Sequence, residues 1–590
     1  MSRLYTLPKK LSYLMSTTSF TSTPSALNAP VTAQPSFASA AAETVPAARR
    51  PWKPYQRILF RIAFPFFVLM SIPTDFGWYK NLFTIDWLHG HYRDVYDIAR
   101  FSPTFFMKGG AEDGTPALLG YDKWFIALGI AFVIGLIWTL IDRKKEEYEV
   151  LYYWLRVIVR FRAGIGIIGF GFTKVFPTQM PYPSIGLLNS DFGDMTAQKI
   201  FWLQIGIVPW YQVFTGLVES LAGVLLFFRR TTFLGAALLL GALGDIVFVN
   251  FAYDGGVHVY SSYFVLLAAF LLIQDIPNVY NLLIRERYTV PHHYYPQFRE
   301  GWLRYTRLGL KAATFGIFLV YLTFLEFLNF NYDPYKQPAQ KGITALRGLY
   351  NVMEFRLNGQ LLPYSPLDSV RWQQATFEKW TTLTYKVNRP LKLDLSNGGG
   401  SPMRDINRTF ETTGLAGGQR VFYYDADTID HTLYLQSKIR TGDRHRGQQN
   451  RDKATAQGGA PRGSSIPAGH TNGYGGDYGG SYVGGNEAER QAKYQASLAE
   501  WISPAALAHI GDETAKINPS AYSTRRVRGI RAEQLPEKRD RMILTYRATD
   551  GGKHVILRGL NEKKDSLYVV LDRVDRKYTL SESTLSAGQY

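Results

Sequence analysis

The sequence predicts a membrane-embedded α-helical bundle followed by a C-terminal antiparallel β-barrel or sandwich. The first observation is a set of about seven long apolar runs before residue 330, each close to the ~20 residues that a helix needs to cross a bilayer core of about 30 Å. The second is a series of short β-rich runs separated by turn residues after residue 343. The mean hydropathy of −0.12 averages these two different halves.

Composition narrows the classes of function. The 590 residues carry a formal net charge of +18 and no cysteine. We attribute the positive charge to cytoplasmic loops and tails of a membrane protein, and therefore expect no nucleic-acid partner. The lack of cysteine excludes disulfides, thiol redox chemistry and cysteine-ligated zinc or iron–sulfur clusters.

The N-terminal part begins with residues 1–50, which are rich in Ser, Thr, Ala and Pro and are expected to form a disordered tail. Residues 51–150 are expected to hold two transmembrane helices, Arg57–Ile72 and Trp124–Ile141. The long connection between them, Thr74–Tyr121, is too long for a structureless loop, so we expect short interfacial helices there.

Residues 151–284 form the expected four-helix core, and residues 285–330 a cytoplasmic loop and the last transmembrane helix. The core runs are Leu155–Val175, Ile205–Phe228, Phe233–Phe251 and Tyr260–Ile276, and the last is Leu308–Leu328, which carries Glu326. The distribution of Lys and Arg predicts a bacterial inner-membrane protein with a cytoplasmic N-terminus and a periplasmic C-terminal domain. The oligomeric state stays open.

Residues 343–590 are expected to form the outward-facing β-rich domain. The candidate strands are Leu349–Leu357, Thr382–Val387, Val421–Tyr424, Thr432–Leu435, Met542–Tyr546, His554–Leu557, Leu567–Leu571 and Tyr578–Leu580. Residues 442–487, rich in Gly, Gln, Asn and Tyr, are expected to form a disordered insertion, followed by a short helix at Ala488–Glu500. Trp372 and the tyrosines of the strands are expected in its core.

The motif Gly164-Ile-Gly166-Ile-Ile-Gly169 matches a dinucleotide-binding fingerprint only in its letters. It lies inside an apolar helix without a preceding strand or a βαβ unit. Small residues at such spacing let two membrane helices approach closely. We therefore interpret these glycines as helix-packing residues.

Polar residues inside the apolar runs are the candidate functional residues, because ionisable groups at mid-membrane are usually paired or functional. Lys174, Glu219 and Asp245 lie within three core runs, and Asn250, Asp254 and His258 crowd the predicted outer mouth. This set suits a polar head group, a quinone ring or a proton. The alternative is that Lys174 pairs with Asp245 or Glu219 and only stabilises the bundle. The histidines have no metal-binding spacing, so we predict no metal site, and no acid–base pair is recognisable in the β-domain.

Several motifs resemble those of DoxX-like membrane proteins. They are Arg162, Gly169-Phe-Gly-Phe-Thr-Lys174, Thr215-Gly-Leu-Val-Glu219 and Phe228-Arg-Arg-Thr-Thr232. A longer, uncharacterised branch is also similar through Trp154-Leu-Arg156, Asn250-Phe-Ala-Tyr-Asp254 and Leu349-Tyr-Asn-Val-Met-Glu-Phe355. The resemblance implies a membrane four-helix bundle, and some relatives serve quinone-linked sulfur oxidation or partner redox-defence enzymes.

Two functional hypotheses follow. The first is a DoxX-like protein that contacts membrane lipid, binds a quinone or lipid-like molecule through Lys174, Glu219 and Asp245 with Arg162 at the cytoplasmic end, and supports a redox or oxidative-stress pathway. Without a cofactor motif, electrons would come from the ligand or a redox partner protein, so the chain would be at most a subunit of a quinone-linked oxidoreductase. The second is a non-enzymatic anchor that presents the β-domain to a protein or envelope ligand.

Overall fold

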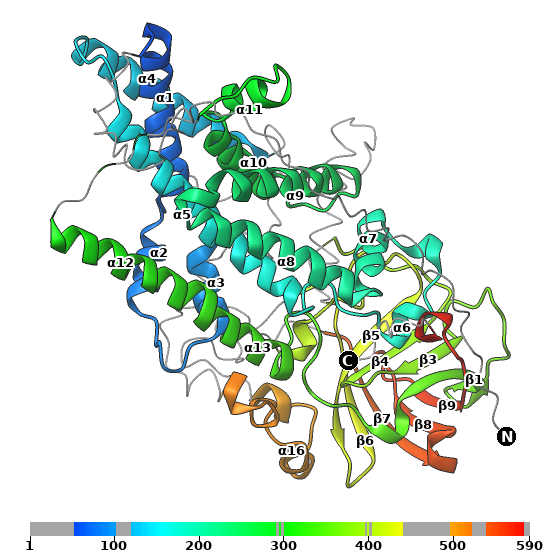
Figure 1. The fold of residues 1–590 in the computed structure, drawn as a ribbon. Helices are drawn as coiled ribbons and strands as arrows, with labels where there is room; N and C mark the ends of the chain where they lie inside the picture. The colour runs from blue at the N-terminus through cyan, green and yellow to red at the C-terminus, as the bar shows by residue number, and fades with distance from the viewer. Residues whose placement is uncertain are drawn as a thin grey trace, which may run out of the picture. The chain divides into compact units, whose positions relative to one another are not determined.

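The computed structural model describes residues 52–101, 120–290, 294, 296, 300–395, 398–399, 404–439, 492, 496–521 and 539–582 (Figure 1). All of them belong to one unit that begins at Trp52. The predicted disordered tail 1–50 and insertion 442–487 lie outside the described residues, as does much of the predicted helix Ala488–Glu500.

The N-terminal part is helical, and its helices follow the apolar runs. Their bounds are α1 Pro54–Ser71, α2 Phe76–Phe83, α3 Tyr92–Ala99, α4 Asp122–Ile141, α5 Glu149–Val175, α6 Ile185–Leu188, α7 Ala197–Gly206, α8 Pro209–Leu226, α9 Thr232–Ala252, α10 His258–Leu272, α11 Ile276–Leu283, α12 Gly301–Phe315 and α13 Leu322–Tyr332. The short helices α2 and α3 confirm that the long first connection contains short helices, while their place at the membrane interface stays a prediction.

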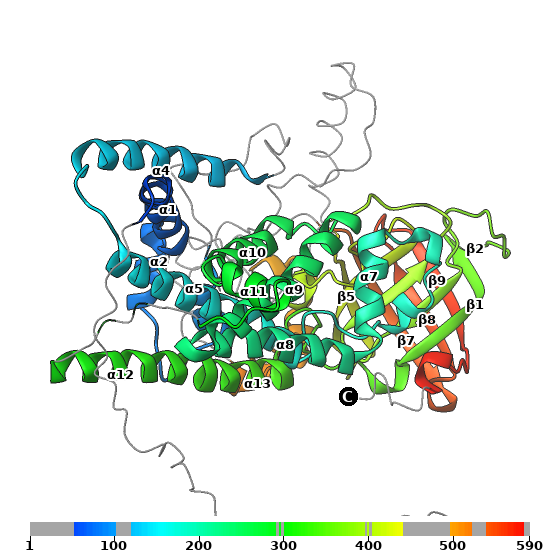
Figure 2. The same ribbon diagram turned by 45° about the horizontal axis from the view of Figure 1, so that its top comes forward.

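Among the described residues, three helical stretches are long and apolar enough to cross a membrane, and six if each of three bent helix pairs counts as one span. Helix α5 is not among them, although it has 27 residues, and it carries four Lys or Arg side chains. The predicted seven spans correspond to these six stretches plus α5. Figure 2 shows α12 and α13 running end to end, joined by a π-helical turn at Gly316–Tyr321.

Two predicted spans are not single helices. The run Ile205–Phe228 is broken between α7 and α8, whose axes differ by 92°. Pro209 explains the break, because proline has no N–H and disfavours helical backbone at the residue before it. The run Tyr260–Ile276 likewise ends as a helix at Leu272, and α11 continues at 71° to α10.

Helices α5 and α8 pack closely through two glycine pairs. A Cβ added at Gly171 would lie 2.8 Å from the carbonyl oxygen of Gly216, and one added at Gly164 would lie 2.9 Å from that of Gly223. Larger side chains at these positions would force the backbones apart. The interpretation of this glycine-rich stretch as a helix-packing motif is thereby confirmed for Gly164.

The C-terminal domain is an eight-stranded antiparallel barrel. Strands β1 and β3 to β9 pair in chain order, pairing of β1 with β9 closes the sheet, and β2 adds a short hairpin to β1. The bounds are β1 Gly348–Leu357, β2 Gln360–Leu361, β3 Gln374–Phe377, β4 Thr382–Lys386, β5 Gln419–Asp427, β6 Thr432–Ser437, β7 Arg541–Thr549, β8 His554–Leu560 and β9 Ser566–Arg573.

Seven of the eight predicted strands are present, so the barrel alternative is confirmed. The eighth, Tyr578–Leu580, is wrong, since a 3-10 turn occupies Thr579–Glu582. Trp372 lies in the barrel core as expected, with its ring stacked 3.9 Å from that of Tyr385. Strands β2 and β3 were not predicted because they are only two and four residues long.

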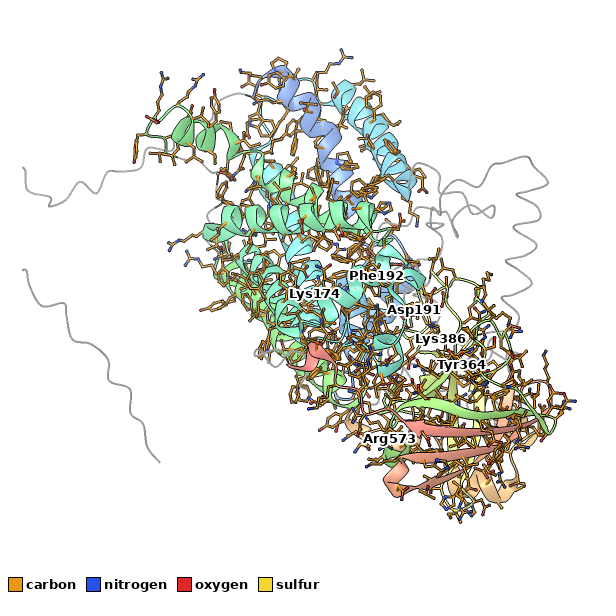
Figure 3. All side chains as sticks on the ribbon, turned by 90° about the vertical axis from the view of Figure 1, so that its right-hand side faces the viewer. Lys174, Asp191, Phe192, Tyr364, Lys386 and Arg573 are labelled. Carbon is orange, nitrogen blue, oxygen red and sulfur yellow. The ribbon has the colours of Figure 1, made fainter. Side chains whose placement is uncertain are left out.

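The connection between α5 and α7, residues 176–196, packs against the barrel. Asp191 forms an ion pair with Lys386, and both are labelled in Figure 3. The backbones of Met195 and Leu415 form an antiparallel bridge, and Asn189 donates to the Tyr578 hydroxyl at 2.7 Å. The connection and the C-terminal domain are therefore in direct contact.

Candidate functional site

The predicted polar set is centred on one buried ion pair. Lys174, in the last turn of α5, pairs with Glu219 in the middle of α8, and their side chains are 11% and 2% exposed. The close approach of α5 to α8 makes the pair possible, because Gly216 lies against the Cβ of Lys174. Of the two predicted partners of Lys174, Glu219 and Asp245, the structure shows Glu219.

The pair does not use all of its hydrogen-bonding capacity. Within the described part of the chain, Glu219 Oε2 is buried without a hydrogen-bond partner, and so is the neighbouring Ser220 hydroxyl. A buried polar atom without a partner costs roughly 1–3 kcal/mol. One of these atoms belongs to the ion pair itself, and the other is on the next residue of α8.

Asp245 does not belong to this site. It was expected to face inward, but its side chain is exposed on α9. Sequence alone gave both Asp245 and Glu219 a place inside an apolar run and could not tell which face of its helix each occupies. The prediction of a three-residue Lys174–Glu219–Asp245 group is therefore wrong in its third member.

Arg162 holds a neighbouring helix in place. Its guanidinium donates to the carbonyl oxygens of Ala99 at 2.8 Å and Phe101 at 2.6 Å, and it lies 3.8 Å from the centre of the Phe101 ring. These carbonyls are at the C-terminal end of α3, where an α-helix leaves acceptors unsatisfied and favours a cation. The residue positions α3 against α5.

The residues of the predicted outer mouth shape the loop between α9 and α10. Asn250 is buried and binds its own loop, donating to the Ile246 carbonyl at 2.7 Å and accepting from the amide of Val257. Asp254 is exposed with a positive φ of 52°. The His258 ring packs 4.6 Å from that of Phe251. The structure does not bring these three residues to the Lys174–Glu219 pair.

Glu326 is a buried acid that the sequence analysis noted but did not select. It lies on α13, is fully buried, and neither carboxyl oxygen has a hydrogen-bond partner among the described residues. Helix α13 packs against α3, whose Tyr92 hydroxyl is also buried and unpartnered in the described part. Only the position of Glu326 in an apolar run signalled it.

A second set of buried charges joins the connection to the barrel. The Glu378 carboxylate accepts from the amides of Ile185 and Gly186 at 3.0 and 2.7 Å. Burial raises the pKa of Glu378 to about 7, and the nearby Glu411 also raises it. The hydrogen bonds from the two amides lower the pKa but do not outweigh burial. Burial also holds the pKa of Lys336 well below its usual value, and Lys199 adds to this effect.

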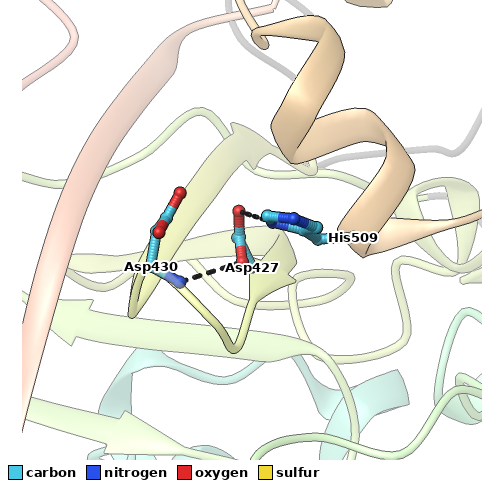
Figure 4. A group of neighbouring side chains, drawn as sticks. All are labelled: Asp427, Asp430 and His509. Atoms are coloured by element: carbon cyan, nitrogen blue, oxygen red, sulfur yellow. Dashed lines mark hydrogen bonds and ion pairs between the residues drawn. The ribbon is translucent and has the colours of Figure 1, made fainter.

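The barrel carries an acid–base pair that the sequence analysis did not recognise. His509, on α16 (Pro504–Ile510), lies 2.9 Å from the Asp427 carboxylate at the end of β5 (Figure 4). With Asp430, these residues offer ligand atoms within 4.8 Å of one another, although no metal site was predicted. The other Asp427 oxygen accepts from the amides of Ile429 and Asp430, so a hairpin turn already accounts for much of the arrangement.

Burial acts to raise the pKa of Asp427, but hydrogen bonds from His509 and from the two turn amides outweigh it and lower the pKa below its ordinary value. No spacing rule links Asp427 to His509, because 82 positions and the insertion separate them in the chain.

The comparisons with known proteins do not assign a family. No family model matches the chain, and no solved structure matches it significantly. The uncharacterized protein YwoB of Bacillus subtilis (strain 168) is 36% identical over 93 residues, which cover 14% of this chain and 60% of YwoB. The chain thus spans less than two thirds of this relative's length, and the relative brings no assigned activity.

Proposed function

We propose that the protein is a DoxX-like multi-pass protein of the bacterial inner membrane that binds a quinone, or a similar lipid-soluble carbonyl compound, at the Lys174–Glu219 pair. The observation that carries this proposal is the buried ion pair with two unpartnered polar atoms, Glu219 Oε2 and Ser220 Oγ, beside it. A ligand that reaches such a site from the bilayer must be largely apolar with a few polar atoms.

The chemistry of the pair suits a quinone. A quinone carbonyl accepts a hydrogen bond, and the Lys174 ammonium and the Ser220 hydroxyl can each donate one. In a quinol the same oxygen carries a hydrogen and can donate a hydrogen bond, which Glu219 Oε2 can accept. The resemblance to DoxX-like proteins, some of which serve quinone-linked oxidation, supports the same ligand class. Any electrons come from the ligand itself or from a redox partner protein, and Arg162 acts by positioning α3.

The test is the lipid content of the purified protein. We expect an isoprenoid quinone to co-purify with the wild-type protein in detergent and to be lost from the Lys174→Ala variant, as measured by mass spectrometry of the organic extract. Asp245→Asn is the matched control, because it removes a charge from the exposed face of a neighbouring helix. Equal quinone content in all three samples, or none in any, would refute the proposal.

A second candidate function is that of an anchor presenting the barrel to a periplasmic protein or envelope ligand. The observation in its favour is the rigid junction, in which Arg408 pairs with Asp333 just after α13 and both side chains are at most 1% exposed. Under this function, a variant without bound quinone would keep its biological role, whereas a redox-support function would be lost with the quinone.

A further inference from the structure

The β-domain contains a pocket of about 690 Å³ at one end of the barrel. This volume falls in the range of roughly 300–1,000 Å³ that is typical of small-molecule sites. The walls are the segment 339–344, the adjoining ends of β4 and β5, and helix α16 with the turn after it. The residues that matter below are Lys341, Thr381, His509 and Lys516.

One wall of the pocket is held in place by the rest of the domain. The Asp405 carboxylate accepts from the amides of Ala339 and Gln340 at 2.8 to 3.1 Å. The Tyr424 hydroxyl accepts from the amide of Ile343 at 3.1 Å. A site whose backbone is fixed before binding loses less conformational entropy when a ligand arrives.

The described side chains that line the pocket include basic groups. They are Lys341, Lys516 and His509, together with three threonines and no Asp or Glu, while the Asp427 carboxylate contacts His509 outside the lining. Both lysines are exposed at its rim. Basic side chains gathered around a concave surface raise the local concentration of anions and speed their binding.

The lining combines polar and apolar surface. Thr381 lines the pocket and is 7% exposed, but its hydroxyl oxygen is buried and has no hydrogen-bond partner in the described part of the structure. Ile343, Ala426 and Ile510 add apolar surface to the lining. This combination suits an organic molecule with one polar end better than a bare inorganic ion.

The imidazole of His509 is held in position by a carboxylate. Asp427 lies 2.9 Å from Nδ1 and is itself fully buried and bonded to two turn amides. This contact fixes the orientation of the imidazole and leaves Nε2 for another partner, as in other carboxylate–histidine pairs.

We propose that this pocket binds a small organic molecule through a phosphate or carboxylate group, with Lys341 and Lys516 supplying the charge and His509 an oriented imidazole. The ligand is water-soluble and enters from the side of the membrane on which the barrel lies. This site is separate from the Lys174–Glu219 pair, so its failure and the failure of the quinone proposal are independent.

The experiment is isothermal titration calorimetry on the full-length protein in detergent, with inorganic phosphate, glycerol phosphate and citrate as probes. We expect glycerol phosphate or citrate to bind more tightly than inorganic phosphate, because only they can use the apolar lining. The paired change Lys341→Gln and Lys516→Gln is expected to weaken binding by about tenfold or more, equivalent to ~1.4 kcal/mol.

Lys563→Gln is the control, because this lysine is exposed on the barrel outside the pocket and the substitution removes the same charge. The thermal unfolding midpoint of every variant shows whether it folds. As a second measurement on the wild-type protein, a bound probe should protect Lys341 and Lys516, but not Lys563, from acetylation as read by mass spectrometry.

Three outcomes would overturn the proposal. The first is that no probe gives a heat of binding up to about 10 mM, a concentration that corresponds to a binding free energy below ~3 kcal/mol. The second is that the Lys563→Gln control loses as much affinity as the pocket variants. The third is that binding appears only when a divalent cation is added. The last result would assign the surroundings of Asp427, Asp430 and His509 to a metal ion instead.

Discussion

Breaking the ion pair between α5 and α8 is expected to destabilise the helical part strongly. Lys174→Met keeps an unbranched side chain of similar length but leaves the Glu219 carboxylate, 2% exposed, without the only partner that it has among the described residues. Removing one member of a buried pair typically costs about 3–5 kcal/mol, because the other charge stays buried. Glu219→Gln is expected to cost less, since a neutral amide still accepts a hydrogen bond from Lys174.

The double variant Lys174→Met and Glu219→Leu separates the pair's own contribution from the cost of leaving one charge alone. Replacing both members of a buried pair by apolar residues is often neutral or stabilising by about 1–4 kcal/mol. We therefore expect the double variant to be more stable than Lys174→Met alone. The coupling between the two positions should exceed about 1 kcal/mol, as for other residues in direct contact.

The assay is equilibrium unfolding of the detergent-solubilised protein followed by the fluorescence of its tryptophans. Asp245→Asn serves as the control, and because Asp245 is exposed it should not lower the free energy of unfolding by more than about 0.5 kcal/mol. Additive effects of the two single substitutions would refute the reasoning, since they would mean that Lys174 and Glu219 do not interact in the folded protein.

Three further predictions follow from other parts of the structure. Gly216→Ala should destabilise the protein, because its Cβ would lie 2.6 Å from the Gly171 carbonyl oxygen, whereas Gly241→Ala on α9 meets nothing within 4 Å and should be neutral or slightly stabilising in the same unfolding assay. The pKa of Glu378 is about 7 in the folded protein and near 4.5 in the unfolded chain, so the unfolded chain loses this proton at lower pH. The free energy of unfolding should therefore fall as the pH rises from 4.5 to about 7, by at most ~1.4 kcal/mol per pH unit. Glu378→Gln should flatten that fall in a pH series of unfolding curves. Because the chain has no cysteine, single cysteines at Lys563 and Arg230 test the orientation directly: a membrane-impermeant maleimide added to intact spheroplasts should label the first and not the second.

The positions of the helices were predictable from the sequence, but the sides of each helix that are buried were less so. Runs of apolar residues near the length of a span identified the helices, and Pro209 was visible as a reason for a break that the prediction did not make. The direction in which a given side chain points could not be predicted in the same way. Glu219 and Asp245 occupy apolar runs of similar character, and only the packing of α5 on α8 decides that the first is buried.

The barrel was predictable in its strands but not in its sites. Alternating β-branched and aromatic residues marked seven strands, because each strand has one face toward the core. The contact of Asp427 with His509 joins two segments that the sequence places on either side of the insertion, and the burial of Glu378 depends on the connection after α5. Such contacts are set by tertiary packing and leave no local pattern.

The connection that packs on the barrel begins two residues after Lys174. It also contacts α8, because the Gln212 side chain forms two hydrogen bonds with the backbone of Met180, both 3.0 Å long. The chain that leads from the buried lysine to the barrel is therefore held by α8 and, at the amides of Ile185 and Gly186, by Glu378 of the C-terminal domain. We expect a displacement of that domain to reach the Lys174–Glu219 pair through this connection.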